Sequence, residues 1–164
     1  MQSITLSSTD LTILKALQSD GRMSYTKLAK KVGLSNTPCI ERVKRLEKDG
    51  LISGYAATLN PNALGAGLVV FVQIRLNRTA EDVFEAFAQK VMDLDDIQEC
   101  YLVSGNFDYL LKARVADMDE YRYLLGQTLL SLPGVQESTS YVVMEEIKDS
   151  HAVNIDRAKR RLLK

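Results

Sequence analysis

The chain has 164 residues, enough for one domain or two small ones, and its 46% hydrophobic content is ordinary for a protein that buries a core. Its charges cancel but are segregated: residues 1–60 hold nine Lys/Arg and five Asp/Glu, residues 61–149 seven and fifteen, and residues 150–164 five and one. The two cysteines, Cys39 and Cys100, predict neither a disulfide framework nor a zinc site, and no apolar run predicts a membrane span or signal peptide, so we expect a cytoplasmic protein with free thiols.

Residues 6–20 carry the start signals of a first helix. Ser7 and Asp10 have the spacing of a capping box, and Leu6 and Leu11 stand where a hydrophobic staple would close over the helix start. Gly21 is expected to end this helix.

Residues 24–50 are typical of a helix-turn-helix, the second helix being the more basic. Ser24 is a candidate N-cap, and Gly33 can adopt the left-handed conformation that closes a helix before Ser35 caps the next one. One side of the second helix is apolar, with Cys39, Ile40, Val43 and Leu46 at helical spacing.

The opposite side of that helix has the chemistry of DNA recognition. Asn can pair with adenine and Arg with guanine in the major groove, whereas Lys neutralises phosphates without reading sequence. An ordinary solvated helix face is the alternative. The candidate DNA-binding residues are Ser35, Asn36, Thr37, Pro38, Arg42, Lys44, Arg45 and Lys48.

Residues 51–59 predict one or two short strands with a bend at Gly54, which would make the module a winged helix-turn-helix. Residues 61–67 carry no charge and contain Pro61 and two glycines, so we predict a linker. The expected organisation is a DNA-binding domain over residues 1–60, this linker, a second domain over residues 68–149 and a basic tail over residues 150–164.

The second domain alternates between strand and helix patterns. From Leu68 every second residue is apolar, helical spacing follows over residues 79–92, and strands are predicted over residues 97–104 and 107–115 around Gly105 and Asn106. Asp117 caps another predicted helix, and residues 135–148 predict a last strand. The order βαββαβ indicates an α+β, ferredoxin-like sandwich, and the sheet face that its helices leave open predicts a homodimer.

Three segments together resemble the Lrp/AsnC (feast/famine) transcriptional regulators: VGLSNTPCIERVKRLEKDGLISGY, LVSGNFDYLL and SYVVMEEIK. The resemblance runs from about residue 6 to residue 148. It implies a bacterial, nucleoid-associated regulator of double-stranded DNA, a winged helix-turn-helix followed by an amino-acid-sensing domain, and dimers that assemble into octamers arranged as a ring.

The same resemblance implies an amino-acid effector, leucine first among the candidates, near the turn between the second and third strands. Backbone N–H groups at Gly105 and Asn106 could hold its α-carboxylate, and Asp108 could face its ammonium group. Family members often have an acid where Asn106 stands. Without the resemblance, the turn is a plain hairpin with Asp108 as its cap. The candidate effector residues are Leu102, Ser104, Gly105, Asn106, Asp108, Met118 and Tyr141.

The sequence leaves two other functions open. An enzyme is disfavoured because the second domain has no histidine and Cys100 has no visible base, so we expect no catalytic residue, cofactor or metal. An architectural DNA-packaging protein would need no effector. In that case Arg157, Lys159, Arg160 and Arg161 could add phosphate contacts, whereas the alternative for this tail is a disordered, solubilising end.

Overall fold

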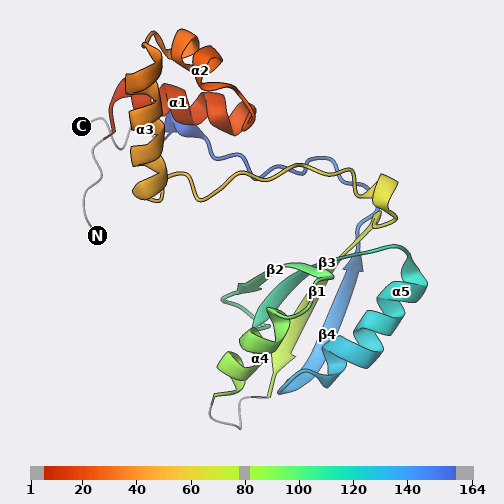
Figure 1. Ribbon diagram of the computed structural model, residues 1–164. Helices are drawn as coiled ribbons and strands as arrows, with labels where there is room; N and C mark the ends of the chain where they lie inside the picture. Colours follow the sequence, from red (N-terminus) through yellow and green to blue (C-terminus); the bar gives the residue numbers. More distant parts are fainter. Residues whose placement is uncertain (1–5, 78–81, 158–164) are drawn as a thin grey trace. The chain divides into compact units, whose positions relative to one another are not determined.

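The computed structural model describes residues 6–77 and 82–157, which form two compact units (Figure 1). One unit combines the N-terminal residues up to Thr58 with a C-terminal segment that starts at Asp149, and the other comprises Leu59–Lys148. Among the described residues, no helix combines the length and the apolar character that crossing a membrane requires.

Three helices build the first unit: α1 (Ser8–Ser19), α2 (Tyr25–Val32) and α3 (Asn36–Lys48). The capping box of α1 is present, because the Ser7 side chain accepts from the Asp10 amide while the Asp10 carboxylate accepts from the Ser7 amide. Ser24 caps α2, and Gly33 closes it with φ of 71°. Ser35 precedes α3 as predicted, but its side chain makes no capping hydrogen bond.

The core of this unit lies where the apolar stripes of the three helices meet. Leu28, Cys39 and Val43 are fully buried there, and burial raises the pKa of the Cys39 thiol. The helix-turn-helix predicted from spacing and caps therefore has a packed interior of its own. Its buried members are Leu6, Leu11, Ile13, Ala16, Leu17, Leu28, Ala29, Cys39, Val43 and Leu46.

The segment predicted as wing strands, residues 51–59, contains no strand in the structure. Leu51 and Ile52 turn back onto the helical core instead, and Tyr55 donates a hydrogen bond of 2.9 Å to Glu47 of α3. A strand needs a partner for its backbone groups, and the described residues provide no ladder here.

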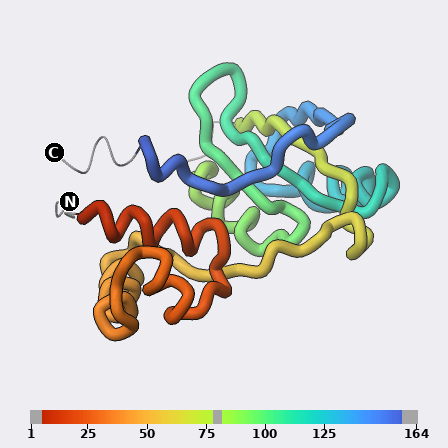
Figure 2. The backbone as a smooth tube through the Cα atoms, turned by 90° about the horizontal axis from the view of Figure 1, so that it is seen from above, coloured from red at the N-terminus to blue at the C-terminus, as the bar shows by residue number. Residues whose placement is uncertain are grey.

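The described part of the C-terminal tail packs on α1 (Figure 2). The Gln18 side chain donates to the carbonyl of Val153 and accepts from its amide, both at 2.9 Å. Lys15 pairs with Asp156 at 2.8 Å, and Ile155 packs against the helical core. The predicted phosphate-contacting residues Lys159, Arg160 and Arg161 lie outside the described residues.

The second unit is a four-stranded antiparallel sheet in the order β2-β3-β1-β4 with α4 and α5 on one face (Figure 1). Its elements are β1 (Leu68–Leu76), α4 (Val83–Val91), β2 (Ile97–Leu102), β3 (Tyr109–Val115), α5 (Met118–Tyr123) and β4 (Val135–Val142). This is the predicted βαββαβ order. A short 3-10 helix, η1 (Asn62–Leu64), interrupts the segment predicted as a linker.

The second helical segment departs from the regular spacing predicted for it. After α5 the chain widens into a π-helical turn, η2 (Leu124–Thr128), and then tightens into a 3-10 turn, η3 (Leu129–Ser131). A π turn advances the buried face by five residues instead of four. Leu129 is consequently fully buried behind Leu124, whereas Leu125 and Thr128 are only partly buried.

The sheet face opposite the helices carries buried charges. Arg114 is 8% exposed and donates to the Gln98 side chain (3.1 Å), the Ala66 carbonyl (3.4 Å) and Glu146 (2.7 Å). It thus joins the start and the end of this unit across the sheet. In the sequence, Arg114 is simply one of the polar residues that alternate with apolar ones along this strand.

Candidate DNA-binding surface and effector site

The basic face of α3 is accessible, and its apolar face is buried. Ser35, Asn36, Thr37 and Pro38 at the start of the helix are all exposed. Lys44, Arg45 and Lys48 follow on the exposed side, and Arg42 is partly buried at its edge. A helix presented in this way can enter a major groove with its first turn toward base edges and its cations toward phosphates.

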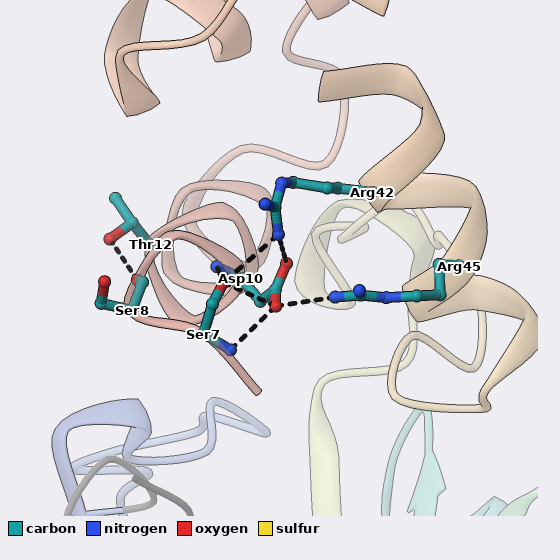
Figure 3. Close-up of polar contacts among 6 residues, drawn as sticks. All are labelled: Ser7, Ser8, Asp10, Thr12, Arg42 and Arg45. Atoms are coloured by element: carbon teal, nitrogen blue, oxygen red, sulfur yellow. Dashed lines mark hydrogen bonds and ion pairs between the residues drawn. The ribbon is translucent and has the colours of Figure 1, made fainter. Parts of the chain in front are cut away.

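Two of these arginines share one buried carboxylate (Figure 3). Arg42 reaches Oδ1 of Asp10 at 2.9 Å and Arg45 reaches Oδ2 at 2.7 Å, although Asp10 is only 1% exposed. Burial alone would raise the pKa of this carboxyl group. Hydrogen bonds from the Ser7 amide and hydroxyl, together with the two guanidinium groups, outweigh burial and lower the pKa.

From the sequence alone, Asp10 is predicted only to cap a helix. Its link to α3 was missed because a capping box needs one carboxylate oxygen, and nothing in the local pattern shows what the other oxygen contacts. The sequence did offer one sign of such a contact. Asp10 lies on the buried side of α1, and a buried charge requires a partner.

The turn between β2 and β3 is longer than the two-residue hairpin suggested by Gly105 and Asn106. The chain leaves β2 at Leu102 and enters β3 at Tyr109, and the Val103 amide donates to the Asp108 carbonyl at 2.9 Å to close the loop. Gly105 has φ of 145°, a conformation that L side chains rarely adopt. Residues 103–108 are therefore a defined loop.

Asp108, the residue before β3, extends the sheet past the first residue of that strand. The β1–β3 ladder ends at the pair Ile74 and Tyr109, and the Asp108 amide then donates to the Ile74 carbonyl at 2.9 Å. Its carboxylate, with the residue 3% exposed, accepts from the Leu76 amide at 2.8 Å. The side chain thereby takes the place of a backbone partner at the end of the strand.

Arg75 fixes the loop from the other side, a role that the sequence did not predict. Its Nε and Nη2 donate to the Asn106 carbonyl at 3.1 and 2.6 Å, and its Nη1 lies 3.1 Å from Glu137 of β4. The register between β1 and β4 shifts here, since Arg75 faces Glu137 while Leu76 faces Val135. An Arg at the polar end of the strand was the only hint that the sequence offered.

An open pocket of about 450 Å³ lies beside this loop. It brings together three of the seven predicted effector residues, Gly105, Asn106 and Asp108, and adds residues from β1 and from the irregular start of β4. The complete lining is Arg75, Leu76, Gly105, Asn106, Asp108 and Gln136.

The apolar candidates lie away from the pocket lining. Leu102 is on the edge strand β2 and Tyr141 on the opposite edge strand β4, and the residues are 66% and 50% exposed. Met118, at the start of α5, is 45% exposed. One copy of the chain thus brings the loop residues together but does not gather all seven candidates.

Both halves of the chain match sequence families. Residues 6–53 match a winged helix-turn-helix DNA-binding family, and residues 69–153 match the Lrp/AsnC ligand binding domain. The chain is 61% identical to the leucine-responsive regulatory protein of Escherichia coli K12 over 146 residues, which is 89% of each chain.

Solved structures agree with the fold. A transcriptional regulator from Neisseria meningitidis, determined as a complex with L-methionine, superposes with a TM-score of 0.90 at 37% identity, covering 94% of this chain and 99% of that one. An AsnC family transcriptional regulator from Agrobacterium tumefaciens superposes with a TM-score of 0.88 at 32% identity, covering 93% and 99%.

Proposed function

The chain belongs to the Lrp/AsnC family of transcriptional regulators, and on that premise we propose that α3 reads a DNA sequence while the second unit responds to an amino acid. The family is one of regulators and not of enzymes. DNA binding is supported mainly by one observation: α3 exposes its basic face while its apolar face packs into the core of the helix-turn-helix. Its first turn meets base edges, and Lys44 and Lys48 meet phosphates.

We propose the loop over residues 103–108 as the place where the effector binds. Backbone N–H groups at Gly105 and Asn106 receive the α-carboxylate. The Asp108 carboxylate, expected from the sequence to face the ammonium group, is buried against the Leu76 amide, so we assign Asp108 to fixing the loop instead. A relative of this chain was solved with L-methionine, and others are named leucine-responsive, which supports an aliphatic amino acid with leucine first. Ser104 belongs to the same loop, and Leu102, Met118 and Tyr141 offer apolar surface to the side chain of the effector.

The assembly proposed is a dimer through the open sheet face, with dimers building a ring-shaped octamer. Exposed apolar residues at both edges of the sheet, including Leu102 and Tyr141, support association between copies and an effector held between them. Two recognition helices in such a dimer would read half-sites about 34 Å apart. A cytoplasmic, nucleoid-associated location belongs to the same proposal.

DNA recognition is tested by measuring the binding of Arg45→Ala to a selected operator and to random duplex. If Arg45 reads a base, affinity for the operator falls by about 1–3 kcal/mol more than affinity for random DNA. Arg22→Ala removes the same charge from an exposed position outside α3 and serves as the control. Equal losses on both DNAs would make Arg45 a phosphate contact. A wild-type protein that selects no sequence would refute the proposed function.

Effector binding is tested by a thermal-shift screen of the purified protein against the twenty amino acids. A ligand at 100 times its dissociation constant adds about 2.7 kcal/mol of stability to the native state. We expect leucine to raise the melting temperature, Asp108→Ala to reduce that rise, and Asp93→Ala, which removes an exposed acid elsewhere, to leave it intact. No shift with any amino acid would refute the effector assignment.

A further inference from the structure

Asp10 is buried more deeply than a helix cap requires. At the third position of α1 its Oδ2 accepts from the Ser7 amide at 2.9 Å, which alone completes the capping box. Oδ1 is left for Arg42, and Oδ2, which also accepts from the Ser7 hydroxyl at 2.7 Å, receives Arg45 as a third partner. The residue is 1% exposed, so this carboxylate has exchanged water for two guanidinium groups of another helix.

The two arginines remain accessible while they are held. Their side chains are 34% and 47% exposed, and Asp10 engages only Nη1 of Arg42 and Nη2 of Arg45. A guanidinium carries five N–H donors in a rigid fork. Within the described residues, Ser7 is the one further partner, at 3.3 Å from Nη1 of Arg42. Donors on each fork therefore remain for a base edge or a phosphate.

The shared carboxylate has two effects on a helix that binds DNA. It restricts the rotamers of two long side chains before DNA arrives, so less conformational entropy is lost on docking. It also places one negative charge against two positive ones, which weakens the attraction of this corner of α3 for any phosphate backbone. Both effects favour the correct sequence over random DNA.

We propose that Asp10 is a positioning residue for DNA recognition, holding Arg42 and Arg45 in the orientation in which α3 reads its site and restraining their binding to random DNA. The inference rests on the proposed function of α3. It assigns a role in recognition to α1, which does not itself carry the basic face.

The test compares Asp10→Asn with Asp49→Asn in the full-length protein. The control removes the same charge from an exposed position at the C-terminal end of α3. Asp49 contacts Arg45 through a hydrogen bond from its backbone amide, which the substitution keeps. Operator is first selected from random duplexes with the wild-type protein, and affinities for operator and random DNA are then measured over a range of salt concentrations. Folding of each variant is checked by circular dichroism melting.

For Asp10→Asn we expect operator affinity to fall while random-DNA affinity holds or rises, lowering the specificity ratio at least tenfold. The salt slope on random DNA should steepen by roughly 0.9 for each guanidinium that gains a phosphate. For Asp49→Asn the ratio should change less than twofold. In an Arg42→Ala, Arg45→Ala background, Asp10→Asn should leave the ratio unchanged, because the groups through which it acts are gone.

An unchanged ratio, or equal losses on both DNAs, would overturn the inference and leave Asp10 a structural cap. If Asp10→Asn does not fold, Asp10→Glu replaces it, because glutamate keeps the charge and suits a capping box but moves the carboxylate. The same criteria then apply. A wild-type protein that selects an operator upholds the proposed function whichever way the Asp10 variants behave, so the two failures are distinguishable.

Discussion

Replacing Asp108 by alanine should open the end of β1 at one backbone amide. Leu76 lies beyond the last β1–β3 pair, and the Asp108 carboxylate accepts its N–H at 2.8 Å in a buried position. Leaving a buried donor unsatisfied costs about 1–3 kcal/mol. If the strand opens locally, that cost corresponds to roughly 5- to 150-fold faster hydrogen exchange of the Leu76 amide.

The assay is residue-resolved hydrogen exchange at one protein concentration, since subunit association would otherwise change the apparent stability. The amide of Val72, in the middle of the same strand and paired on both sides, serves as the internal reference and should exchange at an unchanged rate. Asp108→Asn keeps an acceptor oxygen and should speed Leu76 far less than alanine does.

The reasoning would be refuted if the Leu76 amide exchanged at the wild-type rate in Asp108→Ala. Equal acceleration at Leu76 and Val72 would also count against it, because the loss would then be global instead of local. A local effect accompanied by a smaller thermal shift with leucine would connect this hydrogen bond to the effector loop.

Two further predictions follow from contacts of α1. The lowered pKa of Asp10 means that its contribution to stability is complete above its ordinary pKa of about 3.9 and disappears as pH falls through the lower folded value. Urea midpoints of wild type and Asp10→Asn should therefore converge in acid, and a constant difference down to pH 2 would contradict this. Gln18→Ala removes both hydrogen bonds to the Val153 backbone, so protease should cut residues 149–157 faster than in Gln89→Ala, which alters an exposed glutamine of α4. Equal cleavage rates would mean that Gln18 does not hold the segment.

The sequence predicted best those features that depend on residues only a few positions apart, such as helix caps and strand alternation. The capping box of Ser7 and Asp10 and the left-handed Gly33 lie where predicted, since caps and helix ends depend on residues only a few positions apart. The alternation in β1 likewise identified Val72 and Ile74, both fully buried, as core residues. These features depend on local geometry alone.

The remaining features depend on contacts between distant residues. The π turn that buries Leu129 is chosen by packing against the sheet, and periodicity assumes a uniform turn. Arg114 reads as a solvent-facing residue until Ala66 and Glu146 are brought to it by the fold. In the same way, the second oxygen of Asp10 finds its partner 32 positions away in α3. No local pattern encodes such pairs.

Val153 and Asp156 both bond to α1, so the first unit cannot finish folding until the C-terminal segment has been synthesised. During translation, the three N-terminal helices leave the ribosome first, yet the segment that packs on them is made only after all of Leu59–Lys148. The DNA-binding unit is thus begun before Leu59–Lys148 is made and finished after it. Once it is finished, the chain connects the two units twice, so one proteolytic cut between Leu59 and the start of β1 leaves a second covalent connection intact.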